Sequence, residues 1–296
     1  MLNYRKLFFP LFIVLVFAVG DRVNGTTPII VGQDSLGKKP TEVHQDTGSP
    51  DIPKSKIFEF SENEKRIIDE LKRVRVEREI GALDVNPRIS EAIRQELEKI
   101  INSNETSLTS QQIKKRLNEL VAYLGGVSFI IKGKSFDKLF NRMKQSEKLQ
   151  KEIADSTNLT MAVGLVRGTV TNTSYCIIYL CKYSIEYGIS MVSGPPPPQP
   201  GGGTPNTVFL QYHEINGKCN GKYLKYYLCK ARGLPFYIEK EDVSTGELQT
   251  DENRGFTIRI SYNAYKIEER HLAIFAKTNP SETYSLVDIL MVKSIG

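Results

Sequence analysis

The sequence lacks tryptophan altogether, and it contains only three histidines and four cysteines among its 296 residues. It also lacks the Gly-x-Ser-x-Gly, phosphate-loop, His-Glu-x-x-His and dinucleotide-binding patterns, so it carries no signature of the enzyme classes that use them. Proline and glycine occur 14 and 22 times, and this composition excludes collagen-like, coiled-coil and wholly disordered chains. With 40% hydrophobic and 25% charged residues, the chain can form one large or two small globular cores.

The N-terminus carries the pattern of a secretory signal. Arg5 and Lys6 precede an apolar run that ends at Val19, and the small residues Ala18 and Gly20 occupy the positions that signal peptidase prefers. A helix of this length covers about 20 Å, whereas a membrane anchor must cross roughly 30 Å of hydrocarbon. We therefore expect residues 1–20 to be a signal peptide and the mature protein to be secreted, without a membrane span.

Basic residues gather in two stretches, although the overall charge is mild. Removing the two basic residues of the signal lowers the formal net charge from +6 to +4, which is too weak to indicate a nucleic-acid partner. The candidate anionic-ligand patch consists of Lys114, Lys115, Arg116, Lys218, Lys222 and Lys225. Such a field attracts sulfated glycans, anionic lipid or an acidic partner. The plain alternative is a solvated face that keeps the protein soluble.

Composition divides the chain into segments. Residues 21–56 are rich in Pro, Gly, Asp and Thr without apolar periodicity, and we expect a flexible leader there. Residues 193–205 combine a polyproline run with three consecutive glycines, which is typical of a linker. The expected domains are therefore 57–192 and 206–296.

The two domains show different periodicities. Apolar residues repeat at helical spacing within 62–79, from Asn86 to 101, from the capping box at Thr109 to Gly125, and from Ser135 onward. Three further segments predict strands: residues 127–131 form a short apolar run, and residues 161–166 and 175–183 form a hairpin. We expect an antiparallel sheet between helical layers, an α-β-α sandwich of the α+β class.

The second domain is predicted to be small and β-rich. Its strand-like runs are separated by Gly, Asn and Pro turns, and they cover residues 207–212, 223–229, 236–239, 256–262, 272–276 and 284–292. Periodicity alone leaves a helix within 283–293 open.

Because we expect the chain to be exported, its sequence predicts two kinds of covalent modification. Sequons at Asn104, Asn158 and Asn172 predict N-glycosylation in surface loops, whereas the one at Asn24 lies close to the expected cleavage point. An even number of cysteines in an oxidising compartment predicts disulfides rather than a metal site or a catalytic thiol, and these are Cys176, Cys181, Cys219 and Cys229.

The pairing of these cysteines stays open. On one strand, Cys176 and Cys181 would lie about 16 Å apart on opposite faces, too far for a bridge. Either they bond to Cys219 and Cys229 across the linker, or each region contains one local bridge, which requires a bend near Cys176.

The first domain resembles the CAP superfamily of cysteine-rich secretory, antigen 5 and pathogenesis-related 1 proteins. The resemblance rests on the order of elements, the passage Gly81 to Ile89 between two helices, Val163-Gly164, and Cys181-Lys182-Tyr183. It implies a scaffold whose groove holds a lipid or sterol, or whose surface binds a cell-surface partner. The family's central cleft commonly carries two His and two Glu that bind a metal, but residues 57–192 contain no histidine.

These observations favour a secreted, non-catalytic CAP-like binding protein. We expect no catalytic residue, no metal ligand and no cofactor. One alternative is an extracellular surface antigen or anionic-glycan-binding module of unrelated fold. A weaker alternative is a secreted hydrolase centred on His213, beside Glu214, or on His271, near Glu269, since a carboxylate can orient an imidazole base.

Overall fold

The computed structural model describes residues 58–102, 109–169, 171–192, 210–229, 243–263 and 269–293. The helices of these residues are α1 (Glu62–Glu77), α2 (Pro87–Ile101), α3 (Ser110–Leu124), α4 (Phe136–Lys144) and α5 (Glu147–Ile153). The strands are β1 (Asp84–Val85), β2 (Val127–Gly133), β3 (Thr160–Arg167), β4 (Ser174–Cys181), β5 (Ile185–Val192), β6 (Leu210–Cys219), β7 (Tyr223–Cys229), β8 (Val243–Gln249), β9 (Gly255–Asn263), β10 (Glu269–Lys277) and β11 (Ser285–Lys293). The fold is mixed α+β, as predicted.

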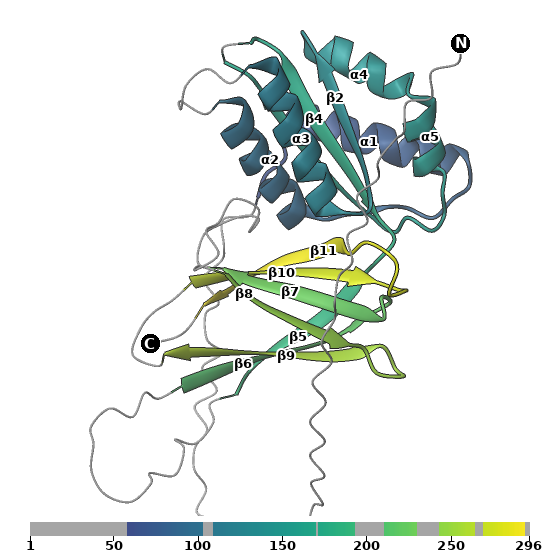
Figure 1. The fold of residues 1–296 in the computed structure, drawn as a ribbon. Helices are drawn as coiled ribbons and strands as arrows, with labels where there is room; N and C mark the ends of the chain where they lie inside the picture. The colour runs from purple at the N-terminus through teal and green to yellow at the C-terminus, as the bar shows by residue number, and fades with distance from the viewer. Residues whose placement is uncertain are drawn as a thin grey trace, which may run out of the picture. The chain divides into compact units, whose positions relative to one another are not determined.

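Sheet A is enclosed between two layers of helices. Its strand order is β1-β3-β4-β2, and only the short β1 runs parallel to its neighbour. Helices α2 and α3 cover one face, and α1, α4 and α5 cover the other (Figure 1). Strand β4 is buried on both sides, because Ile177 and Tyr179 join the core under α2 and α3 while Ile178 and Leu180 join the opposite core. The predicted α-β-α layering is confirmed.

Local hydrogen bonds start and end the helices where the sequence predicts. A reciprocal capping box joins Thr109 to Gln112 at the start of α3, and the Asn86 side chain accepts a hydrogen bond from the backbone of Ile89 at the start of α2. Gly125 ends α3 with a φ of 66°, a conformation that costs glycine little.

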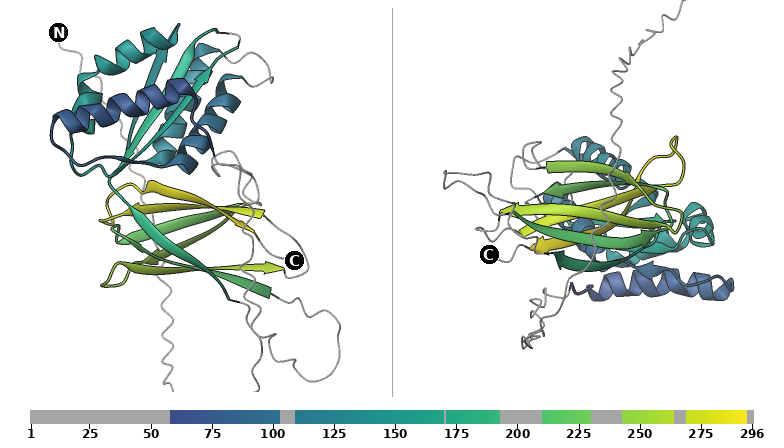
Figure 2. Two further views of the ribbon diagram at one scale, coloured as in Figure 1. Left: turned by 180° about the vertical axis from the view of Figure 1, so that it is seen from behind. Right: turned by 90° about the horizontal axis from the view of Figure 1, so that it is seen from below.

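The described strands of the β-rich part form two sheets. Sheet B has the order β5-β6-β9, and sheet C has the order β11-β10-β7-β8. Apolar side chains of both sheets, among them Ile215 and Ile258 of sheet B and Leu224 and Ile274 of sheet C, belong to one buried cluster. Figure 2 shows the two sheets from behind and from below.

The same cluster includes the inner side chains of α2 and α3, so one core extends from the helices into the β-rich part. Tyr179 of β4 donates a hydrogen bond from its buried hydroxyl to the Leu286 carbonyl of β11 at 2.7 Å. Strand β5, which precedes the predicted linker, pairs along its length with β6, which follows it. The linker, the signal peptide, the leader and residues 236–239 lie outside the described residues.

Four of the described elements were not predicted: α5, β5, β8 and β1, which has only 2 residues. Helix α5 is only 7 residues long, and β5 and β8 contain glycine and polar residues that weaken a strand pattern. Strands β5 and β8 form through pairing with β6 and β7, and such long-range pairing can override weak local propensity. Residues 285–293 form a strand rather than a helix, because β11 pairs with β10.

Candidate functional site

Lysine and tyrosine side chains alternate on one face of sheet C. We call this the Lys–Tyr surface, and it consists of Lys222, Tyr223, Lys225, Lys277 and Tyr284. Tyr223 and Lys225 share a face of β7 because they lie two residues apart, and Lys277 of β10 is directly opposite Tyr223. The Lys277 ammonium lies 4.4 Å from the Tyr284 ring centroid and 5.9 Å from that of Tyr223. The Lys222 ammonium lies 5.7 Å from the Tyr223 centroid. These are cation–π distances.

The charge of this surface is only partly neutralised. Lys225 pairs with Glu247 of β8 at 3.2 Å. Within the described part of the chain, neither Lys222 nor Lys277 lies at ion-pair distance from a carboxylate; the Lys277 ammonium instead donates to the Pro280 carbonyl at 2.8 Å. These two lysines therefore present positive charge beside aromatic rings.

A hydrogen-bonded turn lies next to this surface in the chain. Glu282 accepts hydrogen bonds from the Thr278 backbone at 3.0 Å and from the Tyr183 hydroxyl at 3.0 Å, and it pairs with Lys182 at 3.2 Å. The Thr278 backbone bond, followed by those of Tyr183 and Lys182, lowers the pKa of Glu282 to about 2. The carboxylate is thus held ionised, and it balances Lys182 rather than the lysines of the Lys–Tyr surface.

The structure distributes the predicted basic patch over three elements. Lys222 and Lys225 belong to the Lys–Tyr surface, while Lys218 is exposed on β6 of sheet B, opposite Glu186. Lys114 and Lys115 are exposed on α3, where they line a hollow of about 470 Å³, and Arg116 is half-buried.

Sequence reasoning missed Lys277 and Tyr284. They lie on β10 and just before β11, more than 45 residues from the Lys222–Lys225 stretch, and only the strand register brings them to it. The alternation of Lys and Tyr between 222 and 227 was the signal that did point to this face.

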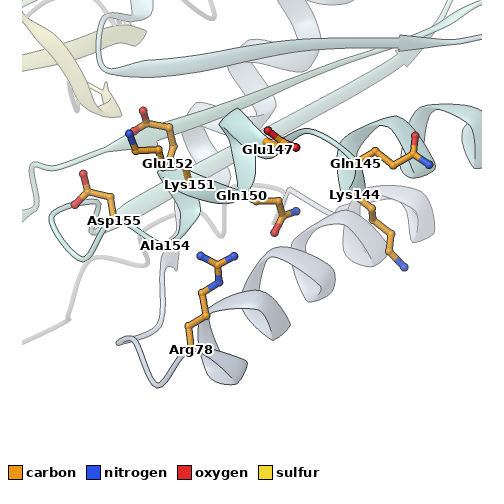
Figure 3. A pocket seen from close by; sticks show the side chains of 9 residues that line it. All are labelled: Arg78, Lys144, Gln145, Glu147, Gln150, Lys151, Glu152, Ala154 and Asp155. Carbon is orange, nitrogen blue, oxygen red and sulfur yellow. The ribbon is translucent and has the colours of Figure 1, made fainter.

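A second hollow lies between the end of α1 and the α4–α5 segment (Figure 3). Its volume is about 580 Å³, and it is lined by Arg78, Lys144, Gln145, Glu147, Gln150, Lys151, Glu152, Ala154 and Asp155. Arg78 reaches toward α5 and Gln150 reaches toward α1 (Figure 3). Three basic and three acidic side chains balance each other, so this hollow has no net charge to select an anion or a cation.

The four cysteines, all within the described residues, are buried thiols and not disulfides in the structure. Cys176 and Cys181 face opposite sides of sheet A, as their spacing predicts, since they belong to different cores. Burial raises the pKa of Cys176 and of Cys181, which makes both poor nucleophiles at neutral pH.

Two of the predicted glycosylation sites are described, and they differ. Asn172 is exposed in the turn between β3 and β4, with a φ of 48°. Asn158 is only 5% exposed, and its side-chain amide donates to the Glu152 carbonyl at 2.8 Å. A glycan on that nitrogen needs space that the buried side chain does not have in the folded turn, so the folded structure favours Asn172. Asn104 lies outside the described residues.

The two histidines that the sequence singled out lie on different sheets, His213 on β6 of sheet B and His271 on β10 of sheet C. His213 and Glu214 are adjacent on β6. Glu214 pairs with Arg259 of β9 at 2.7 Å. His271 lies on β10 between Cys229 and Met291 of the neighbouring strands. Among the described residues, no group of three or more His, Cys, Asp or Glu is placed to hold a metal ion.

No model of a known protein family matches this sequence, and no curated protein does. Among solved structures, the chain is similar to an outer surface protein from Borrelia burgdorferi, with 13% identity and a TM-score of 0.29 over 41% of this chain and 94% of that one. It is also similar to an extracellular protein containing an SCP domain from Bacillus anthracis str. Ames, with 14% identity and a TM-score of 0.28 over 40% of each chain. A β-glucosidase from Kluyveromyces marxianus matches at 8% identity, with a TM-score of 0.17 over 38% of this chain and 15% of that one.

The helices of the described residues are too short or too polar for any of them to cross a membrane.

Proposed function

We propose that this chain is an extracellular, non-catalytic binding protein whose Lys–Tyr surface binds a sulfated polysaccharide. The observation that supports this most is Lys277, whose ammonium lies within cation–π distance of the Tyr223 and Tyr284 rings without a carboxylate partner among the described residues. Sulfate groups pair with such ammonium groups, while the C–H faces of a sugar ring can stack on tyrosine.

The contacts of the surface hold its groups in place before a ligand arrives. The Lys277 ammonium is held by its hydrogen bond to the Pro280 carbonyl at 2.8 Å, and the backbone of the strands fixes the spacing of Tyr223 and Lys225. Side chains that are already ordered lose less entropy on binding. The ordered side chains therefore favour a glycan-binding role for this surface over the alternative that its lysines only keep the protein soluble.

A CAP-like lipid or sterol carrier is the other proposal that the sequence raised. Lipid cavities are lined mainly by apolar side chains, whereas the two hollows described above are lined mainly by charged and polar residues. The layering of sheet A agrees with a CAP-like scaffold, but the exposed chemistry favours a polar, anionic ligand.

Heparin affinity chromatography of the full secreted chain in rising salt tests the proposal. We expect retention at low salt and earlier elution of the variant Lys222→Gln/Lys277→Gln. The matched control is Lys72→Gln/Lys138→Gln, which removes the same charge from exposed positions of α1 and α4. Its elution should stay close to that of the wild type.

A titration against heparin at several salt concentrations gives the second readout. Each lost ionic contact should reduce the slope of log affinity against log salt by roughly one, by analogy with phosphate contacts to nucleic acids. Flow-through of the wild type at low salt, or equal effects of the two double variants, would overturn the proposal. A larger effect of Lys114→Gln/Lys115→Gln would move the site to α3.

A further inference from the structure

Three of the four buried thiols divide between two separate cores. Cys176 is fully buried in the core formed with α1, α4 and α5. Cys181 of β4 and Cys219 of β6 are also buried but belong to the opposite core, and so does the neighbouring Tyr183. Because sheet A separates the two cores, Cys176 has no route to another cysteine without a rearrangement of β4.

Cys229 is separated from Cys219 by the length of a strand. Cys219 ends β6, and after a short turn the chain enters β7 at Tyr223 and reaches Cys229 at the far end of that strand. The 7 residues of β7 span about 20 Å at the usual rise of a strand, whereas the Cα atoms of a disulfide lie within about 7 Å. The local bridge between Cys219 and Cys229 is therefore excluded in this fold.

Cys181 and Cys219 are the two that the fold brings together. Asn220 joins their flanking segments, since its side chain accepts from the Ser184 backbone at 2.9 Å and donates to the Lys182 carbonyl at 3.0 Å. Four residues after Cys181, Ile185 is the direct partner of Cys219 in the β5–β6 pair.

The two thiols also have matching surroundings. The backbone N–H of Tyr183 donates to Cys181 Sγ, and that of Gly221 donates to Cys219 Sγ, each at 3.4 Å. Burial raises the pKa of both thiols, that of Cys219 to about 11, where the hydrogen bond from the Gly221 backbone opposes it.

We propose that Cys181 and Cys219 form a disulfide during export, and that Cys176 and Cys229 remain thiols. The bond joins β4 of sheet A to β6 of sheet B and so closes the chain across the predicted linker at 193–205. Such a cross-link restricts the unfolded chain and stabilises the folded one.

The oxidant for the two thiols is a small disulfide compound such as oxidised glutathione, which is itself reduced. One cysteine thiolate attacks a sulfur of that disulfide and releases one glutathione thiolate, which leaves a mixed disulfide on the protein. The second cysteine thiolate then attacks the protein sulfur, forms the new S–S bond and releases the second glutathione thiolate. The protein loses two electrons and two protons, and one glutathione disulfide becomes two thiols. Because both cysteines are buried in the folded protein, this exchange belongs to the folding stage.

Differential alkylation of the full chain tests the proposal. The protein is secreted from an exporting host, or refolded in a mixture of oxidised and reduced glutathione, then alkylated under denaturing conditions before and after reduction. We expect Cys176 and Cys229 to be alkylated before reduction, and Cys181 and Cys219 only after it. Chymotrypsin cleavage after Tyr179 or Leu180 separates Cys176 from Cys181, so mass spectrometry can identify the linked peptides.

Two double variants provide matched controls. In Cys176→Ala/Cys229→Ala, reduction should raise the intact mass by two hydrogens, and in Cys181→Ser/Cys219→Ser it should leave the mass unchanged. Alkylation of all four cysteines before reduction, or a linked peptide with any other pair, would overturn the proposal. The peptide map of the wild type decides the question even where a variant fails to fold.

Discussion

Asp288 of β11 accepts a hydrogen bond from Arg88 Nε of α2 at 2.9 Å, although the two residues are 200 positions apart. The Asp288 carboxylate is buried, while the Arg88 side chain is 51% exposed. Asn86, the N-cap of α2, also donates to Asp288 at 3.0 Å, and the Tyr187 hydroxyl of β5 contacts it as well. This carboxylate therefore joins the start of α2 to sheets B and C.

Replacing Arg88 by alanine should destabilise the protein by about 1–3 kcal/mol, because a buried carboxylate loses a charged hydrogen-bond donor. Urea unfolding measures this free energy. The control is Lys115→Ala, which removes an exposed pair with Glu119 at 3.8 Å and should change stability by roughly 0–1 kcal/mol. Equal effects of the two substitutions would show that Asp288 is not held by Arg88.

Gly164 of β3 allows α2 to pack closely on sheet A. A Cβ at this position would lie 2.6 Å from Ile93 Cγ2 and 3.0 Å from the Arg94 nitrogen, both on α2. We expect Gly164→Ala to cost about 1–3 kcal/mol through overpacking. Gly81→Ala is the control, since nothing lies within 4 Å of the place that its new methyl group would take, and it should be neutral or stabilising by about 0.4–1 kcal/mol. Thermal unfolding of both variants compares them.

Glu96 of α2 should make stability fall as pH rises. Burial raises its pKa above the ordinary 4.5, although the hydrogen bond from Lys99 at 2.7 Å opposes this. Between 4.5 and the raised value, the folded protein holds a proton that the unfolded chain has released. Its stability then declines with rising pH, by at most about 1.4 kcal/mol per unit.

The variant Glu96→Gln should lose this decline, so its stability relative to wild type should improve as pH rises through that window. Urea unfolding at a series of pH values measures the difference. Glu282, whose pKa is lowered to about 2, makes stability rise with pH instead. This contribution is the same in the variant and the wild type, so it cancels in the difference between them. Parallel pH profiles for the two proteins would contradict the prediction.

Of the two described sequons, we expect only that of Asn172 to carry a glycan in a glycosylating host. Its side chain is exposed, whereas the Asn158 amide is buried and hydrogen-bonded to Glu152. Intact-mass measurement should show the loss of one glycan in Asn172→Gln and no loss in Asn158→Gln. A glycan that disappears from Asn158→Gln would contradict the structure around that turn.

The sequence by itself determined the elements whose signals are local. The N-cap Asn86, the capping pair Thr109–Gln112 and the glycine stop at Gly125 each involve residues a few positions apart, so these helix boundaries follow from short-range hydrogen bonds. The alternation along β4 likewise placed Cys176 and Cys181 on opposite faces, because a strand repeats every two residues.

Only the tertiary structure decided which distant residues meet. Lys277 reaches Tyr223 through the register of β10 with β7, and Asp288 reaches Arg88 through the packing of β11 against α2. The approach of Cys181 to Cys219 depends on the pairing of β5 with β6. Such contacts are set by strand register and by the shape of a shared core, and these arise from the whole chain rather than from any short stretch of it.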